Sequence, residues 1–252
     1  MLLYLLKYLL LCSVLVSFTH RSEGKEPTTI RLVSEEWIRA TQSDGQGLHW
    51  DIFRYVFEPV GITVETDTMD YQDAVNHVHR GLADAWVASA LHEKDFPLYP
   101  KWHYDAEIIS IVFDASKHQA FKGISSLSGK KVAWITGYEY QKYVHVPMFK
   151  VEVDKRLNIL KMLKSGRIDY FLDPKIDATL AKKTYFPDDD SIVIREFKTE
   201  WLYPAFANTP KGEKLRRIWD QRMPEIAASK KMRSLFKQWG FIYPLDKSPL
   251  TQ

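Results

Sequence analysis

The chain has 252 residues, of which 45% are hydrophobic and 27% are charged, and its formal net charge is +3 at pH 7. This composition is typical of a folded protein and excludes a disordered chain or a fibrous repeat. Basic residues are spread among acidic ones, whereas nucleic-acid binding requires a concentrated basic face, so we expect no nucleic-acid partner.

The first 24 residues have the layout of a secretory signal peptide. Lys7 precedes an apolar run over residues 8–18, which gives way abruptly to polar sequence. A membrane-spanning helix needs roughly 20 apolar residues, so we predict export followed by cleavage near residues 19–24. The alternatives are an uncleaved anchor or a lipoprotein attached through Cys12, the only cysteine, although the bulky Leu11 disfavours lipid attachment. Cleavage would leave a mature chain without any thiol.

Short apolar strands then alternate with helical patterns, an order typical of the α/β class. Strands are predicted over residues 30–33, 62–66 and 83–88. Apolar residues at helical spacing predict a helix over 48–58, and Asp70 caps a second helix that ends at Gly81. A strand over 108–113 completes this first unit.

A second unit of the same kind follows the polar segment 114–130. Its predicted elements are strands over residues 131–135, 149–153 and 169–172, with a helix over 154–165. Two further strands are predicted over 192–196 and 202–207. Two helices end the chain, the first opened by Thr209 and Pro210 and the second ending at Trp239.

Five segments fall in the order of one known family: GLHWDIFRYVFEPVGI, YQDAVNHVHRGLADAWVAS, ISSLSGKKVAWITG, LNILKMLKSGRIDYFLD and LYPAFANTPKGEKLRRIWDQRMPEI. Across about residues 28–240 the chain resembles the bacterial extracellular solute-binding proteins of family 3, the periplasmic amino-acid-binding type. The resemblance implies a two-lobed α/β fold, in which each lobe is a mixed sheet flanked by helices and two strands form a hinge.

The resemblance also implies lobe boundaries. Lobe 1 would comprise residues 25–112 and 204–252, and lobe 2 would comprise residues 113–203. The hinge strands would cross between the lobes near residues 109–114 and 200–206.

A periplasmic protein of this kind closes over a small polar solute, here an amino acid or a related amine-bearing compound. Contacts divided between two lobes are complete only when the lobes meet, so binding shifts the population from open to closed. The resemblance implies a monomer that serves ABC-type uptake, with a permease as its partner. A ligand sensor, with a membrane receptor as its partner, is the alternative, and neither a cofactor nor a metal is expected.

In this family the solute lies against loops that follow the strands, where the resemblance places Trp37, Tyr71 and Ser89 of lobe 1. Trp37 either covers the solute or fills the lobe core. Family members usually carry an arginine after the third strand, because its planar fork holds a carboxylate with two hydrogen bonds. Here the nearest cation is Lys94, which is either a point-charge contact or a solvated surface residue, so the amino-acid solute stays open.

In lobe 2, Thr136, Gly137 and Tyr138 follow a predicted strand, at the position where the family receives an anionic group. Asp173 follows another strand and lies within one residue of the family's acidic ligand for an ammonium group. The alternative for Asp173 is a cap on the turn before Pro174.

We expect no catalytic activity. The motifs GxSxG, HExxH and GxxxxGK[ST] do not occur in the sequence. His77 and His79 lie two apart on a predicted helix and point to different faces, unlike a helical zinc site. The alternative is a dehydratase-like enzyme on the same fold, for which His92, His103 and Glu93 are the available acid–base groups.

Overall fold

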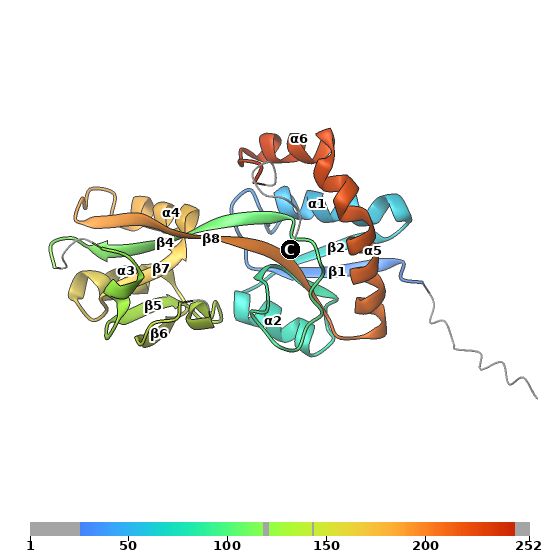
Figure 1. The fold of residues 1–252 in the computed structure, drawn as a ribbon. Coiled ribbons are helices and arrows are strands. Elements are labelled where there is room, and N and C mark those ends of the chain that lie inside the picture. The colour runs from blue at the N-terminus through green and yellow to red at the C-terminus, as the bar shows by residue number, and fades with distance from the viewer. Residues whose placement is uncertain (1–25, 118–120, 143, 245–252) are drawn as a thin grey trace, which may run out of the picture.

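The computed structural model describes residues 26–117, 121–142 and 144–244, so the predicted signal peptide lies outside the described residues. The strands are β1 (Thr29–Ser34), β2 (Thr63–Thr68), β3 (Ala85–Ala90), β4 (Asp105–Asp114), β5 (Lys131–Ile135), β6 (Phe149–Val153), β7 (Tyr170–Pro174) and β8 (Ile192–Phe206). They form one sheet in the order β2-β1-β3-β8-β4-β7-β5-β6, and β4 and β8 connect two lobes (Figure 1). The predicted α/β class and two-lobed fold are confirmed.

Lobe 1 is built on β1, β2 and β3, as the first sequence unit predicts. β1 pairs in parallel with both β2 and β3, because the crossover helices α1 (Leu48–Phe57) and α2 (Tyr71–His79) return the chain to the same end of the sheet. α1 continues into a short 3₁₀ helix at Glu58–Val60. Gly61 then ends it with a φ of 81°, a left-handed conformation that glycine adopts without strain.

Lobe 2 is built on β5, β6 and β7. β5 pairs in parallel with β6 and β7, and β7 pairs antiparallel with β4. The helices α3 (Arg156–Ser165) and α4 (Lys175–Tyr185) cross over this sheet, with 3₁₀ helices at Ile124–Leu127 and Tyr140–Lys142.

Helix α4 was not predicted from the sequence. Ala178 and Ala181 are its only fully buried residues, whereas Ile176 and Leu180 are 54% and 40% exposed. Its apolar residues therefore do not form the core-facing stripe by which an amphipathic helix is recognised.

The strands β4 and β8 run antiparallel from the Asp105–Leu202 pair to the Asp114–Ile192 pair. The prediction of two strands in this region was wrong, because β8 is a single strand of 15 residues. Its middle, residues 195–200, is polar except for Phe197 and mostly exposed, yet it stays paired with β4 apart from one irregularity in register between Ile109 and Ser110. A strand that passes between two lobes is not packed against a core along its whole length, so its sequence need not be apolar throughout.

The pairing pattern shows where these strands pass between the lobes. Residues 109–112 of β4 pair with β7 of lobe 2, and residues 202–206 of β8 pair with β3 of lobe 1. Residues 105–108 and 199–201 lie between those two sets of pairings.

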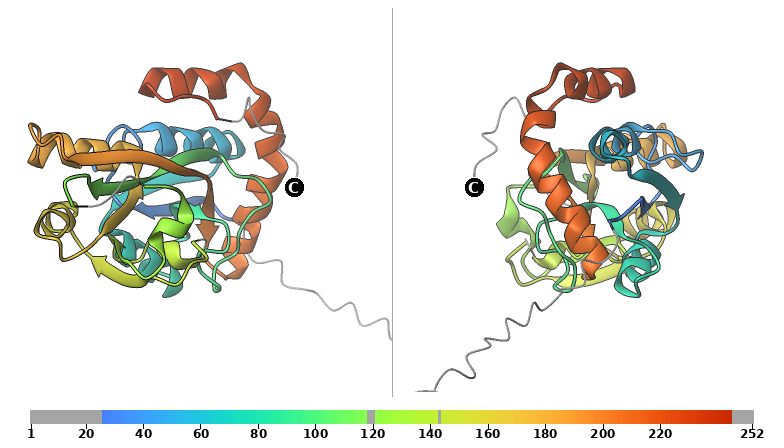
Figure 2. Two further views of the ribbon diagram at one scale, coloured as in Figure 1. Left: turned by 60° about the vertical axis from the view of Figure 1, so that its left-hand side comes forward. Right: turned by 90° about the vertical axis from the view of Figure 1, so that its right-hand side faces the viewer.

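The last two helices, α5 (Pro210–Ala228) and α6 (Lys230–Trp239), return to lobe 1 and pack against α1 (Figure 2). The Thr209 hydroxyl accepts a hydrogen bond from Gly212 N, which confirms the predicted start of α5. Trp219 of α5 packs on Phe53 of α1 with ring centroids 4.9 Å apart. No helix in the described part of the chain combines the length and the apolar content that crossing a membrane requires.

The lobes touch each other through aromatic side chains. One hydrophobic cluster joins α2 and β3 of lobe 1 to the sheet of lobe 2. Within it, the rings of Tyr71 from lobe 1 and Tyr138 from lobe 2 lie 5.1 Å apart and nearly perpendicular. The structure is therefore a closed arrangement of the two lobes.

Candidate functional site

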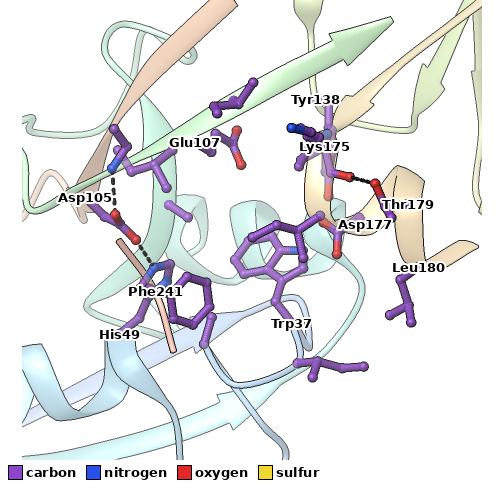
Figure 3. A pocket seen from close by; sticks show the side chains of 18 of the residues that line it. Trp37, His49, Asp105, Glu107, Tyr138, Lys175, Asp177, Thr179, Leu180 and Phe241 are labelled. Atoms are coloured by element: carbon purple, nitrogen blue, oxygen red, sulfur yellow. Dashed lines mark hydrogen bonds and ion pairs between the residues drawn. The ribbon is translucent and has the colours of Figure 1, made fainter. Parts of the chain in front are cut away.

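A pocket of about 580 Å³ lies between the two lobes, with β4 as its floor (Figure 3). Its size falls within the range of small-molecule sites. Lobe 1, the first turns of α4 in lobe 2 and the segment after α6 all contribute to its wall. The lining residues used below are Trp37, His49, Tyr71, Glu93, Asp105, Glu107, Tyr138, Lys175, Asp177, Leu180 and Phe241.

Carboxylates of β4 and α4 face this pocket. Asp105 and Glu107 lie two residues apart on β4 and so point to the same side of the strand, and Asp177 approaches from the first turn of α4. His49 Nε2 lies 2.9 Å from the Asp105 Oδ2 atom. Glu107 makes no side-chain hydrogen bond or ion pair with any described residue.

The surroundings of Glu107 favour its protonated form. Burial raises the pKa of Glu107 well above its usual value, and the charges of Asp177 and Asp173 raise it further. A cation beside this carboxyl would reverse the preference, because opposite charge stabilises the ionised form.

Aromatic and aliphatic side chains form most of the rest of the wall, and Lys175 and Lys183 of α4 also line it. The Trp37 ring lies between Tyr71 and His49, at centroid distances of 6.2 and 6.5 Å. Its indole Nε1 is buried and has no hydrogen-bond partner among the described residues, which leaves one donor available. The pocket thus combines negative charge with flat apolar surface, on which a cation can stack.

The residues predicted from lobe 1 lie in two places. Trp37 and Tyr71 line the pocket, whereas Ser89 is buried beside it. The Ser89 hydroxyl donates to Glu93 Oε2 at 3.0 Å, and the Tyr71 hydroxyl donates to the same oxygen at 2.7 Å. Burial raises the pKa of Glu93 to about 7, and Lys94 opposes that rise.

Lys94 reaches across to lobe 2. Its Nζ donates to the carbonyl oxygen of Gly137 at 3.0 Å and lies 2.6 Å from Glu139 Oε1. The Thr136 hydroxyl donates to Asp154 Oδ1 at 2.7 Å. Lys94 and Gly137 therefore join the lobes to each other in this structure.

Asp173 is fully buried and pairs with Arg156, a residue that the sequence analysis did not single out. Nε and Nη2 of Arg156 lie 2.8 and 3.2 Å from the two Asp173 oxygens. Burial raises the pKa of Asp173, and the guanidinium of Arg156 opposes that rise. This two-pronged contact needs the carboxylate form.

Of the predicted site residues, Trp37, Tyr71 and Tyr138 meet in the pocket. Direct solute contacts by Ser89, Lys94, Thr136, Gly137 and Asp173 stay predictions, since each is engaged with other protein groups here. No cluster of three or more metal-ligating side chains occurs among the described residues.

The sequence analysis missed the acidic part of the pocket. Asp105 and Glu107 precede the apolar run by which their strand was recognised, although their two-residue spacing was a usable signal. Asp177 lies on α4, the helix that was not predicted. No local sequence pattern indicates that Arg156 pairs with Asp177.

No protein-family model matches the sequence, and no curated protein is similar to it in sequence. Three solved structures illustrate the likeness in fold. EhuB in complex with hydroxyectoine has 18% identity and a TM-score of 0.66 over 86% of this chain and 90% of that chain. The amino-acid ABC-transporter substrate-binding protein AbpA from Streptococcus pneumoniae, bound to L-arginine, has 15% identity and a TM-score of 0.62 over 84% and 94%. An ancestral amino-acid-binding protein, a precursor of cyclohexadienyl dehydratase, has 15% identity and a TM-score of 0.63 over 84% and 95%.

At these identities the likeness establishes the fold. The chain has the two-lobed fold of the solute-binding proteins of amino-acid ABC transporters, which confirms the resemblance inferred from the five sequence segments at that level.

Proposed function

We propose that this protein captures a small, positively charged solute, an amine-bearing compound with an apolar or aromatic portion, in the interlobe pocket. The observation that carries the proposal is the set of carboxyl groups, Asp105, Glu107 and Asp177, in a wall that is largely apolar and aromatic and whose cations are Lys175 and Lys183 of α4. Buried carboxylates near one another are costly, and a bound cation relieves both their mutual repulsion and their lost hydration. Trp37 and Tyr138 supply faces on which the solute stacks.

The two strands β4 and β8 would form the hinge. We place it at residues 105–108 and 199–201, which lie between the pairings of the two lobes and precede the sequence-predicted crossing on β4. Asp105 and Glu107 lie within this stretch, so a solute held there touches the hinge and both lobes at once. Its binding energy then favours the closed arrangement.

In the cell the proposed role is capture in the periplasm after export, as a monomer, and delivery to the permease of an ABC transporter. This rests on the predicted signal peptide and on the fold shared with transporter components. A membrane sensor that recognises the closed form is the alternative partner.

We propose binding without chemistry, and one observation favours an enzyme as the second candidate. His49 and Asp105 form a hydrogen-bonded pair at the pocket wall beside Glu107, an arrangement that can move protons. One protein of similar fold is a precursor of a dehydratase. An enzyme would convert the solute, whereas a binding protein returns it unchanged.

A thermal-shift screen tests the proposal. Purified protein is heated with polyamines, guanidino compounds, aromatic amines, neutral amino acids and dicarboxylates. A tight cationic solute stabilises by about 2.7 kcal/mol at a hundredfold excess over Kd. The best compound is then recovered and analysed by NMR after overnight incubation. Stabilisation by dicarboxylates alone contradicts the cationic solute, and a converted compound supports the enzyme.

A further inference from the structure

The guanidinium of Arg156 lies at the contact between the lobes and is surrounded by acceptors from both. Its Nη1 donates to Glu35 Oε1 at 2.9 Å, and Nη2 donates to the Tyr138 hydroxyl at 2.9 Å. Nε and Nη2 bind the two oxygens of Asp173, and Nη2 lies 3.4 Å from Asp177 Oδ2. All three guanidinium nitrogens are thus engaged in the fork geometry that a guanidinium requires.

These acceptors form a site for a cation. The Asp173 side chain is completely buried, and those of Glu35 and Asp177 are less than one-fifth exposed. Three carboxyl groups share this one guanidinium, and burial raises the pKa of both Asp173 and Asp177. Without Arg156 these carboxylates would lie close together with no counter-ion, which is costly in a buried position.

The same guanidinium joins the two lobes. Glu35 follows β1 in lobe 1, whereas Arg156, Asp173, Asp177 and Tyr138 all belong to lobe 2. The Tyr138 hydroxyl donates to the second Glu35 oxygen at 3.0 Å, so both oxygens of that carboxylate are held by the opposite lobe.

Two lysines add further links around this centre. Lys94 of lobe 1 contacts Gly137 and Glu139 of lobe 2, and Lys142 of lobe 2 donates to the carbonyl oxygen of Glu93 at 2.6 Å. In a hinged protein, a solute closes the lobes by completing contacts on both sides. Here a side chain of the protein makes contacts of that kind.

We propose that Arg156 is an internal ligand: its guanidinium fills a cation site built by Glu35, Asp173, Asp177 and Tyr138, and holds the lobes together without any solute. Two consequences follow. The lobes are closed before the pocket at β4 is filled, and removal of the Arg156 side chain creates a site selective for small guanidinium compounds. This goes beyond the proposed function, because it concerns a separate cation site and the solute-free protein.

Small-angle X-ray scattering of dialysed, solute-free protein tests the proposal. The wild-type protein should be compact, with a radius of gyration of about 18 Å for its length. Arg156→Ala should have a clearly larger radius and a Tm lower by roughly 10 °C. Millimolar methylguanidinium should restore both values in this variant, whereas methylammonium at the same ionic strength should not, because it lacks the planar fork.

Matched variants separate this role from a general effect on folding. Arg167→Ala removes an exposed arginine of the same lobe and should leave the radius unchanged. Glu35→Ala removes the carboxylate that Arg156 and Tyr138 bind in lobe 1, leaves the Arg156–Asp173 pair intact, and should open the lobes even if Arg156→Ala fails to fold.

The proposal is overturned if solute-free wild-type protein is open, if both Arg156→Ala and Glu35→Ala stay as compact as wild type, or if methylguanidinium does not re-close a folded, open Arg156→Ala. None of these measurements includes a pocket solute. Failure here therefore leaves the thermal-shift test of the proposed function unaffected, and failure of that screen leaves the scattering result standing.

Discussion

Two sites between the same two lobes contain carboxyl groups, and they differ in that the carboxyl groups around Arg156 have a guanidinium partner, whereas Glu107 on β4 has no side-chain partner among the described residues. Around Arg156, the carboxylates of Glu35 and Asp173 are bound by a guanidinium. On β4, Glu107 makes no side-chain hydrogen bond or ion pair with any described residue, and its surroundings raise its pKa. Asp177 belongs to both groups, since it approaches Arg156 and lines the pocket.

A carboxylate that is already paired contributes to stability, whereas one without a partner is available to recognise a solute. A buried carboxylate with a fixed counter-ion is satisfied within the fold, so a solute gains little by approaching it. A carboxyl group without a partner has interaction energy that only an incoming group can supply. In the functions proposed above, the carboxyl groups around Arg156 hold the lobes together and Glu107 selects the solute.

The largest expected effect on stability comes from a substitution in the cluster around Arg156. Asp173→Asn leaves the buried Arg156 guanidinium without its two-pronged partner and should lower the free energy of unfolding by about 3–5 kcal/mol. Urea titration followed by tryptophan fluorescence measures this. Asp188→Asn, an exposed change in the same lobe, should stay within about 0.5 kcal/mol. Equal stability of the two variants would show that the Arg156 pair is not a stabilising contact.

The next largest effect is expected on solute affinity, from a substitution of Glu107. Glu107→Gln keeps the shape of the side chain but removes its charge, so the Kd of the best cationic solute should rise about 30-fold or more, which corresponds to about 2 kcal/mol. The urea midpoint of the solute-free protein at pH 7 should rise, because Glu107 has no side-chain partner to lose and its ionisation opposes folding. Isothermal titration calorimetry gives the Kd. Unchanged affinity would place the charged end of the solute elsewhere.

The pH dependence of binding should follow from the raised pKa of Glu107. The solute-free folded protein keeps this proton above the usual value of 4.5, so its stability falls as pH rises toward the folded pKa. A bound cation lowers that pKa and releases the proton, so affinity for the cation should increase with pH, by up to about tenfold per unit.

Calorimetry between pH 5.5 and 8 measures this dependence. Asp105, Asp177 and His49 face the same space, and Glu93, with a pKa of about 7, titrates in the same range. Glu107→Gln and Glu93→Gln are therefore compared in parallel. Loss of the slope only in Glu93→Gln would transfer the proton linkage to Glu93.

The fold could be predicted from the sequence more completely than the arrangement of charged residues in the site. β1 and α1 were predicted because their apolar residues recur at strand and helix spacing, which is a local property. The single strand β8 and the helix α4 were not predicted, because β8 is held by pairing with β4 and α4 turns Ile176 and Leu180 toward a pocket instead of a core.

The same reasoning explains which site residues were found. Trp37, Tyr71 and Tyr138 follow strands or begin helices, so their place near the cleft follows from fold topology. Arg156 reads in the sequence as an ordinary helix residue. Its contact with Glu35 joins positions 121 residues apart and exists only when the lobes meet.

The smallest expected effect comes from Lys175, a cation that lines the same pocket as Glu107. Lys175 lines the pocket and forms an exposed ion pair with Glu196 at 2.6 Å, so Lys175→Ala should change the free energy of unfolding by less than about 1 kcal/mol. Removing one positive charge near the carboxylates should tighten a cationic solute about two- to threefold. Lys198→Ala, which removes a cation from an ion pair on β8, is the matched control. The sign is more informative than the size of this effect, because an anionic solute would bind more weakly to Lys175→Ala, and that result would refute the assignment of the β4 carboxyl groups as the recognition group.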